Sequence, residues 1–234
     1  MYIVEGNIGA GKSTFLKLIG NQLPTISVGL EPLNNWHNEN SGQSLLQQFY
    51  TNPKRWAFTL ETLAMMSRVK EHMLEQQHSS SLRIVERSIY SGYYCFAQNS
   101  YDSGFLTDIE WNIYKDWFNF LTRNNCDKPQ GFIYLKVDPA VAFERTKKRN
   151  RSAESTLALE YLHDIDKLHN SFLIEKKGID ERLINVPVLV LDCNAEFQDD
   201  KEKFSQHCRS LLAFLQDTSE GTNFSDFNEV SINI

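Results

Sequence analysis

The sequence contains no run of 18 consecutive apolar residues, so it has no segment that could cross a membrane as a single helix. It also has no excess of basic residues, since 24 lysines and arginines stand against 30 aspartates and glutamates, for a formal net charge of −6. Proteins that coat nucleic acid concentrate positive charge over a broad face, which this acidic balance excludes. We therefore expect neither a membrane nor a nucleic acid among the partners.

Targeting and cross-linking signals are missing as well. Neither a basic segment nor an Arg- and Ser-rich amphipathic presequence precedes the first apolar run at Tyr2, which favours a cytoplasmic location. The four cysteines form no Cys-x-x-Cys pair, so their spacing supports neither a zinc site nor a disulfide framework. We expect buried free thiols in a reducing compartment at these positions, which are Cys95, Cys126, Cys193 and Cys208.

The chain has the length and apolar content of one globular domain. With 234 residues, 41% of them hydrophobic, it needs no covalent staple, because a chain of this size buries roughly 70% of its unfolded surface. Continuous hydrophobicity is typical of strands covered on both faces, and it predicts an α/β fold with a parallel five-stranded sheet between helices. The five apolar runs behind this prediction are Tyr2–Val4, Ile26–Leu30, Leu82–Val85, Phe132–Val137 and Val188–Leu191.

Three longer helical patterns separate these runs. The first begins at Pro53, a favourable first helical residue, and continues to about Gln77, while the third covers Leu157 to Lys177. The second, Asp108 to Arg123, carries large side chains at offsets of three and four, which favours a core or dimer face over a cofactor site. These are Trp111, Tyr114, Trp117, Phe118 and Leu121. Residues 217–234 hold four acids and no lysine or arginine, which predicts a polar acidic tail after a domain of residues 1–216.

A phosphate-binding loop lies between the first strand and the helical run that includes Thr14. Its eight residues match the pattern G-x-x-x-x-G-K-[ST], and they are Gly6, Asn7, Ile8, Gly9, Ala10, Gly11, Lys12 and Ser13. Such a loop points its N–H groups at phosphate oxygens, with the lysine on the β- and γ-phosphates and the hydroxyl on Mg²⁺. The motif predicts a nucleoside triphosphate with Mg²⁺, and does not say what reaction follows.

Charged residues follow the second and third strands. The second strand ends in Glu31 and the third in Glu86 and Arg87, and ligands of parallel sheets bind at the carboxyl ends of strands. One carboxylate could accept the proton of an attacking hydroxyl, the other could hold metal, and the arginine could neutralise the transferred group. The alternative for Glu31 alone is a strand-end cap or a solvated acid.

Two further patterns bear on the site. The segment 145–151 has five basic residues in seven, which in a phosphate-loop protein favours a basic lid, about residues 145–154, over a solvated cationic face. On the first long helix, Glu61, Ala64, Met65 and Arg68 share one stripe. That stripe could line a pocket for a planar ligand or be an exposed polar surface, and periodicity alone leaves both open.

Taken in order, these motifs resemble the deoxynucleoside kinases, the family of deoxycytidine, deoxyguanosine and insect multisubstrate kinases. The resemblance runs from residue 1 to about 215, and each motif after the phosphate loop is weak alone. The matching segments are Gly6 to Ser13, Glu31-Pro32-Leu33-Asn34-Asn35-Trp36, Tyr50-x-x-Pro53-x-Arg55-Trp56, Glu86-Arg87-Ser88-Ile89-Tyr90-Ser91, Arg149-x-Arg151-x-x-Glu154 and Leu159-Glu160-Tyr161-Leu162 with Ile165, Lys167, Leu168 and His169.

The resemblance implies a P-loop kinase fold and transfer of the γ-phosphate of ATP to the 5′-hydroxyl of a deoxyribonucleoside, with Mg²⁺, in a homodimer. It places Glu31 at the general base, Arg87 beside the 5′-oxygen and Glu86 near magnesium. It also assigns substrate contacts, which are Tyr50 and Glu154 for the 3′-hydroxyl, Trp36 and Phe96 for the base, Arg145, Arg149 and Arg151 for the lid, and Glu196 with Phe197 for the adenine.

Two positions depart from the family pattern. Glu61 stands where most members have a Gln that pairs with the base, and Gly92-Tyr93 replaces Asp-Arg or Ala-Arg. An ionised Glu61 offers only acceptors, which would suit the N1–H and N2–H₂ of guanine, with Arg68 available to O6 or N7. A purine, deoxyguanosine in particular, is therefore favoured, although pairing of Glu61 with Arg68 or its protonation would admit other bases.

Two other functions compete with this one. A nucleoside monophosphate kinase would use the same loop and lid, but it needs basic residues near the acceptor, where residues 50–68 supply only Lys54, Arg55 and Arg68. A catalytically silent kinase-like subunit would bind nucleotide without turnover. This alternative is disfavoured by the intact catalytic residues, which are Lys12, Ser13, Glu31, Glu86 and Arg87.

Overall fold

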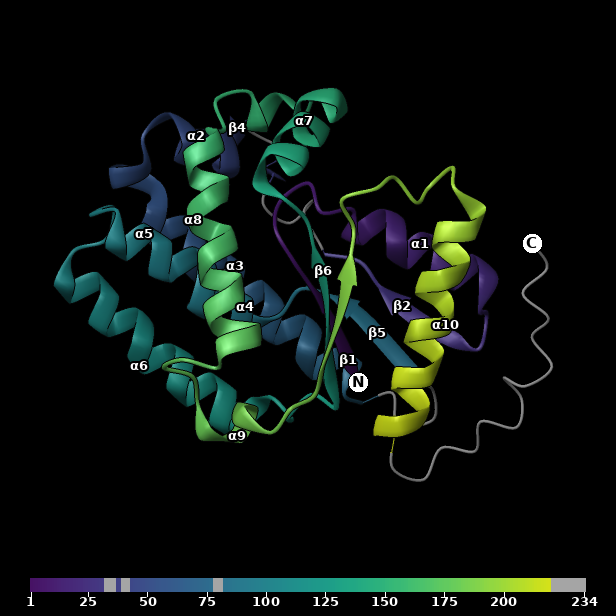
Figure 1. Ribbon diagram of the computed structural model, residues 1–234. Coiled ribbons are helices and arrows are strands. Elements are labelled where there is room, and N and C mark those ends of the chain that lie inside the picture. Colours follow the sequence, from purple (N-terminus) through teal and green to yellow (C-terminus); the bar gives the residue numbers. More distant parts are fainter. Residues whose placement is uncertain (32–36, 39–42, 78–81, 220–234) are drawn as a thin grey trace.

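A five-stranded parallel sheet forms the centre of the computed structural model, which describes residues 1–31, 37–38, 43–77 and 82–219 (Figure 1). The strand order is β2-β5-β1-β6-β7, and every neighbouring pair is parallel. This confirms the predicted α/β class and all five strands. Their bounds are β1 Tyr2–Glu5, β2 Ile26–Gly29, β5 Leu82–Glu86, β6 Gly131–Lys136 and β7 Val188–Asp192.

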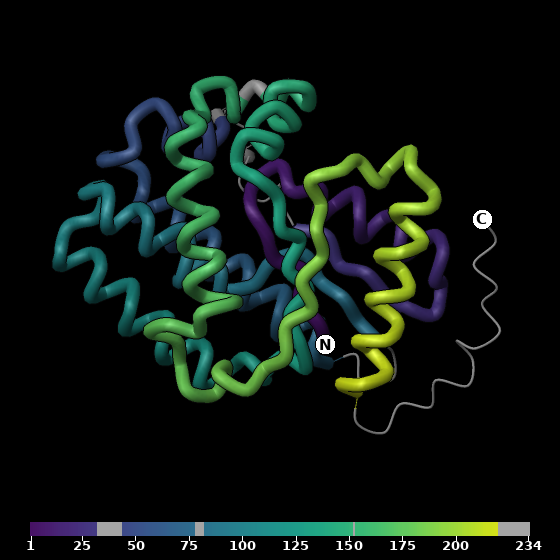
Figure 2. Tube along the Cα trace, in the orientation of Figure 1, coloured from purple at the N-terminus to yellow at the C-terminus, as the bar shows by residue number. Residues whose placement is uncertain are grey.

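Helices cover both faces of the sheet, as the continuous apolar strands require (Figure 1). On one face lie α1 (Lys12–Gln22) and α10 (Lys201–Thr218), whose buried Phe15 and Leu211 belong to one apolar cluster. On the other lie α3 (Pro53–Glu75), α4 (Ile89–Ser91) and α8 (Leu159–Asn170), next to a second cluster that includes Met65 and Ile89. The chain starts at the amino-terminal edge of the parallel strands (Figure 2). There Tyr2 Oη and Thr218 Oγ1, at the end of α10, lie 2.8 Å apart.

An outer helix, α6 (Asp108–Asn125), packs beside α3 and begins with a capping box between Thr107 and Glu110. Its inner face stacks on Tyr93, whose ring centroid is 4.0 Å from Phe118 and 5.2 Å from Trp111. The prediction of a core face is therefore confirmed for these two aromatic residues. Trp117, from the same pattern, is instead 52% exposed.

Shorter elements complete the chain, and several of them were not predicted. The first three are β3 (His37–Asn38), β4 (Gln43–Ser44) and α2 (Leu45–Thr51), and after α4 come a π-helical segment η2 (Gly92–Ala97) and α5 (Gln98–Asp102). The others are α7 (Pro139–Arg149), η3 (Ser152–Glu154), η4 (Ser171–Glu175) and α9 (Glu181–Ile184). A π-helix places one extra residue in its turn, so neither η2 nor η4 follows the 3.6-residue period that sequence patterns detect.

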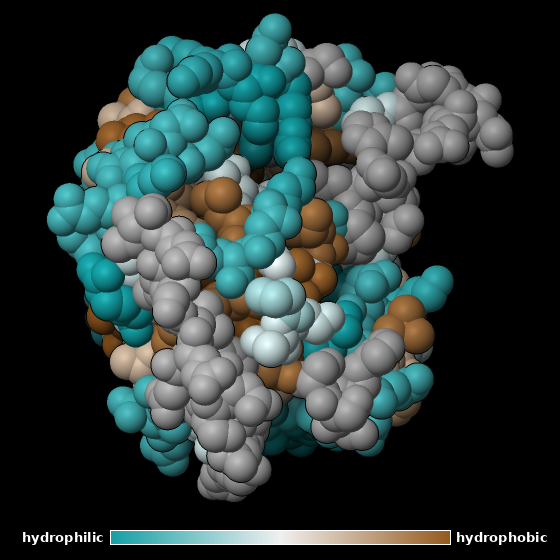
Figure 3. All heavy atoms as spheres, turned by 90° about the vertical axis from the view of Figure 1, so that its right-hand side faces the viewer, coloured by the Kyte–Doolittle hydropathy of each residue, from teal (hydrophilic) through white to brown (hydrophobic). Residues whose placement is uncertain are grey.

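The surface and the thiols agree with the composition. All four cysteines are free and buried, as expected. In the part of the chain that the structure describes, no helix is both long and apolar enough to span a bilayer. On the side of α1 and α10, polar side chains surround a smaller group of apolar ones (Figure 3). Of the predicted tail, α10 takes the first two residues, and residues 220–234 lie outside the described part.

Candidate active site

The phosphate loop connects β1 to α1 at the carboxyl edge of the sheet. Gly6 has a φ of 145°, and a Cβ there would lie 2.6 Å from the carbonyl oxygen of Leu135 on the adjacent strand. Gly11, with a φ of 91°, would place a Cβ 3.0 Å from the Phe197 ring. Only glycine satisfies both the left-handed backbone and the close packing, so the loop can wrap tightly around a phosphate group.

Lys12 is folded into this loop. Its Nζ donates to the carbonyl oxygens of Gly6 and Asn7 at 3.1 and 2.8 Å, and the residue is 5% exposed. Burial, with help from the nearby Arg87 charge, lowers the pKa of Lys12 to about 7. An incoming phosphate would reverse this effect, because an anion beside an ammonium group favours its charged form.

Ser13 and Glu86 meet beside the loop. The Ser13 hydroxyl lies 2.8 and 3.0 Å from the two carboxylate oxygens of Glu86, and the Glu31 backbone N–H donates to the same carboxylate at 3.3 Å. No cluster of three or more His, Cys, Asp or Glu side chains suited to a metal occurs among the described residues. Magnesium bound with a nucleotide needs only one or two protein ligands with hard oxygen atoms, so this hydroxyl and carboxylate fit it.

Glu31 lies between two guanidinium groups. Arg68 Nη2 is 2.7 Å from Glu31 Oε1, Arg87 Nε is 3.3 Å from Oε2, and the Glu31 side chain is 8% exposed. Burial acts to raise the pKa of Glu31, but the charges of Arg68 and Arg87 outweigh it and hold the pKa below its ordinary value. The carboxylate is therefore ionised near neutral pH and able to accept a proton.

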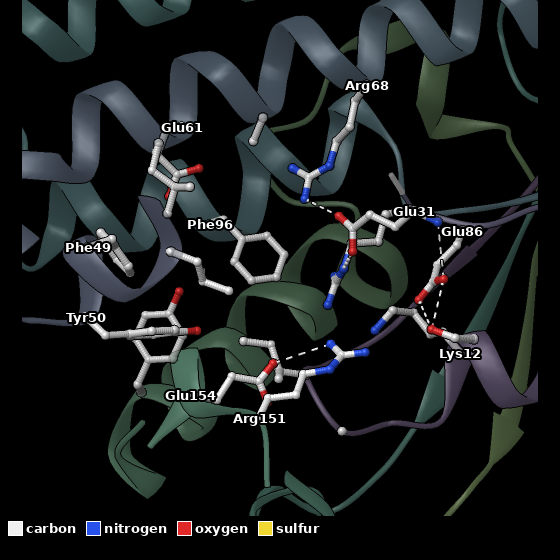
Figure 4. Close-up of a pocket in the computed structure, with 18 of the residues that line it drawn as sticks. Lys12, Glu31, Phe49, Tyr50, Glu61, Arg68, Glu86, Phe96, Arg151 and Glu154 are labelled. Atoms are coloured by element: carbon white, nitrogen blue, oxygen red, sulfur yellow. Dashed lines mark hydrogen bonds and ion pairs between the residues drawn. The ribbon is translucent and has the colours of Figure 1, made fainter. Parts of the chain in front are cut away.

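The charged residues described above line one half of a single cavity, and aromatic side chains line its other half. Figure 4 shows Phe49, Tyr50 and Phe96 on one side, and Lys12, Glu31 and Glu86 on the other. The Arg87 guanidinium lies 4.6 Å from the centre of the Phe96 ring, at the boundary between the two halves. One end of the cavity thus suits a planar apolar group and the other a charged one.

The segment predicted to be a lid forms one wall of the cavity. Glu154 in η3 accepts a hydrogen bond from Arg149 at 2.5 Å and lies 3.6 Å from Arg151. The carboxylate is 7% exposed and lines the cavity together with Tyr50 and Tyr161, whose rings pack edge to face at 6.2 Å. The predicted Tyr50 and Glu154 therefore lie in one cavity with two of the three predicted lid arginines.

The stripe on α3 is buried, which rejects the alternative of an exposed polar surface. Glu61 is 4% exposed and Arg68 8%, and both line the cavity with Ala64. The Ser100 hydroxyl donates to Glu61 Oε1 at 3.1 Å, and burial raises the pKa of Glu61 to about 7, against the opposing charge of Arg68.

Gly92 and Arg68 are sterically linked. A Cβ on Gly92 would lie 2.7 Å from Arg68 Nη1, so the absence of a side chain at residue 92 gives the guanidinium the room it occupies. Both positions that depart from the family pattern therefore interact with Arg68, residue 92 sterically and Glu61 electrostatically. Helical spacing predicted that Glu61 and Arg68 share a stripe, but it did not indicate the link to Gly92.

Three predicted contacts lie outside this cavity. Arg145 donates to the carbonyl oxygens of Cys193, Asn194 and Ala195, and so ties α7 to the loop after β7. In that loop the Glu196 carboxylate accepts N–H groups of residues 197 and 198, and Phe197 is 2% exposed beneath the phosphate loop. Trp36 is outside the described residues.

Several lining residues were missed. Leu46, Phe49 and Leu60 come from α2 and α3, and in the sequence they look like ordinary core residues. Glu5, which is fully buried at the end of β1 and does not line the cavity, was missed as well. Its signal was visible, since a charged residue ends an apolar strand directly before the loop.

The chain matches the deoxynucleoside kinase family model over residues 2–215. It belongs to the deoxynucleoside kinase family. Relatives of this deoxynucleoside kinase include deoxyguanosine kinase, mitochondrial, of Xenopus laevis, which is 37% identical over 91% of this chain and 88% of the relative. Deoxycytidine kinase 2 of Gallus gallus is 36% identical over 91% and 89% of the two chains. Human deoxycytidine kinase is 32% identical over 91% and 90%. The family predicted from the motifs is confirmed.

Proposed function

We propose that this member of the family transfers the γ-phosphate of ATP to the 5′-hydroxyl of a deoxyribonucleoside, with Glu31 as the general base. The observation that carries the proposal is the position of Glu31. Its ionised carboxylate lies in the charged half of the cavity and is paired with Arg87 at the boundary with the aromatic half, where a sugar hydroxyl would approach a triphosphate.

The charged residues of the cavity suit a direct in-line transfer of the γ-phosphoryl group. Glu31 accepts the proton as the 5′-oxygen attacks the γ-phosphorus, and the bond from phosphorus to the bridging β,γ-oxygen breaks to release ADP. Arg87 sits beside Glu31, where it would offset the charge that develops on the transferred group. Lys12 and the lid residues Arg149 and Arg151 would hold the triphosphate, and closing the lid would exclude water.

Ser13 and Glu86 would hold magnesium. A divalent ion held there would neutralise charge on the phosphate oxygens of the donor. Adenine contacts would come from the Glu196–Phe197 loop, which Arg145 fastens to α7, next to Gly11 of the phosphate loop.

Tyr50 and Glu154 would hold the 3′-hydroxyl of the sugar. Both line the cavity wall, with Tyr50 partly buried and the Glu154 side chain 7% exposed, and we expect their contacts with the sugar to leave little room for a 2′-hydroxyl. Ribonucleosides should accordingly be poorer substrates, because an extra hydroxyl must be accommodated or left without a partner.

For the base, we favour a purine and in particular guanine. Phe96 offers a ring face, Glu61 offers acceptors when ionised, and Arg68 offers donors from the same helix. Guanine presents two adjacent donors to a carboxylate and two acceptors to a guanidinium, a pattern that this pair complements.

A homodimer through α6 is part of the proposal. Ile109, Ile113, Trp117 and Phe120 recur at intervals of three or four and are 73%, 43%, 52% and 56% exposed. An apolar stripe of this kind on one helix suits a second copy of the same helix. The cytoplasmic location stays a prediction, and one relative is named as mitochondrial.

The test is a phosphorylation assay with ATP and Mg²⁺ on deoxyguanosine, deoxyadenosine, deoxycytidine, thymidine, guanosine and deoxyguanosine monophosphate, with the Lys12→Ala variant as the background control. We expect turnover of deoxynucleosides above guanosine, with deoxyguanosine leading. Activity on the monophosphate alone would indicate a nucleoside monophosphate kinase. ATP binding without any turnover would indicate a silent subunit.

A further inference from the structure

Glu5 is a buried acid that the proposed reaction does not use. It ends β1, the central strand, one residue before the phosphate loop, and its side chain is fully inaccessible. A carboxylate in the interior is costly unless charges and hydrogen bonds compensate for its lost hydration. Its contacts therefore identify the groups that it positions.

Its hydrogen-bond partner is Ser88. The Ser88 hydroxyl donates to Glu5 Oε1 at 2.5 Å, and accepts the N–H groups of Tyr90 and Ser91 at 3.1 and 3.2 Å. With both backbone N–H groups as its donors, the hydroxyl has one proton to give, and Glu5 receives it. Glu5 thus fixes the side chain that caps α4 and the backbone directly after Arg87.

Arg87 itself has an unusual backbone. Its φ is 63°, in the left-handed region that non-glycine residues seldom occupy. Its N–H donates to the carbonyl oxygen of Val4 at 2.9 Å, so β1 holds Arg87 through Val4 on one side and, through Glu5 and Ser88, on the other. Such a conformation persists only where its surroundings impose it, and the end of β1 supplies both restraints.

Electrostatic interactions also link Glu5 to Arg87. Glu5 Oε2 and Arg87 Nη1 are both buried and have no hydrogen-bond partner among the described residues. Burial raises the pKa of Glu5, while the Arg87 charge, the hydroxyls of Ser88 and Ser91 and the Arg68 charge oppose that rise. Glu5 and Arg87 therefore interact electrostatically as well as through Ser88.

We propose that Glu5 is a positioning residue, which acts through Ser88 to hold Arg87 in the backbone conformation that presents its guanidinium to Glu31 and the 5′-oxygen. The inference rests on the proposed function, because it concerns the geometry of a group assigned to phosphoryl transfer. It adds a residue outside the cavity wall to the set that determines the rate.

The test is a double-mutant cycle on the full chain with ATP, Mg²⁺ and the deoxynucleoside that the wild type phosphorylates best. Glu5→Gln keeps the shape of the side chain but replaces a carboxyl oxygen by an amide N–H₂ group, which weakens the hydrogen bond with Ser88. We expect kcat to fall by about tenfold or more while both KM values change by less than about twofold. In an Arg87→Lys background the same change should cost little further, because the group that it positions is already altered.

A matched pair of variants covers the case in which Glu5→Gln does not fold. Ser88→Ala removes the link at α4, and Thr107→Ala removes a comparable N-cap hydroxyl at α6. Ser88→Ala should reproduce the fall in kcat, and Thr107→Ala should keep the wild-type kcat. Wild-type kcat in Glu5→Gln or Ser88→Ala, or an equal loss in both Arg87 backgrounds, would overturn the inference. Failure of the proposed function is distinguishable, because the wild type would then show no turnover of any deoxynucleoside.

Discussion

Glu61→Gln should make the stability of the protein less dependent on pH. The folded state raises the pKa of Glu61 from an ordinary 4.5 to about 7, because the carboxyl group is buried. A raised acid pKa means that the folded state binds the proton more tightly, so its contribution is full below pH 4.5 and is lost as pH rises through 7. At ~1.4 kcal/mol per pKa unit, the ionised carboxylate lowers the free energy of unfolding by up to ~3 kcal/mol above pH 7.

The assay is urea unfolding of wild type and Glu61→Gln at pH 5, 6, 7 and 8. The variant should gain up to ~3 kcal/mol relative to the wild type between pH 5 and 8, because glutamine keeps the shape and loses the buried charge. Glu144→Gln is the control, since that acid is 72% exposed and should track the wild type. Wild-type and Glu61→Gln curves that stay parallel across this range would refute the reasoning.

The same group should make base selectivity depend on pH. With a pKa of about 7, most of Glu61 is protonated at pH 6 and most is ionised at pH 8. A hydrogen bond to a charged group contributes about 1.5–3 kcal/mol, so the preference for deoxyguanosine over deoxyadenosine should rise by about tenfold or more between these values. The kcat/KM ratio of the two substrates measures it, and a ratio that varies equally in Glu61→Gln would contradict the assignment.

Three more variants test the remaining assignments. Glu31→Gln should lower kcat by about 10²–10⁴-fold with ATP binding retained, and steady-state kinetics with unchanged kcat would exclude Glu31 as the base. Gly92→Ala should displace the Arg68 guanidinium and raise the KM for the deoxynucleoside several-fold. The KM for ATP is the internal control, and equal effects on both KM values would contradict a role of Gly92 confined to the deoxynucleoside site. Trp117→Glu should convert a dimer into a folded monomer, as measured by light scattering, because the side chain is 52% exposed and does not support the core; a wild-type monomer would remove the dimer from the proposal.

The predicted lid shows that helical spacing alone could not assign the partners of its arginines. Arg145 and Arg149 are four residues apart on one helix, and the sequence treats them alike. In the fold, Arg149 reaches Glu154 and the cavity, whereas Arg145 bonds to carbonyl groups of a loop that follows β7. Which partner an exposed helix face meets depends on elements distant in the chain, and helical spacing carries no information about them.

The sequence by itself determined the strands, the phosphate loop and the family, because these depend on local properties. Continuous apolar runs predict buried parallel strands, and glycine spacing together with Lys12 and Ser13 predicts a loop that binds phosphate. Only the tertiary structure decided that Glu31 lies between Arg68 and Arg87, that Gly92 makes room for Arg68, and that Glu5 supports the segment after β5. The reason is physical: pKa shifts and steric fit arise from groups far apart in the chain, which only the packed sheet and helices bring within contact.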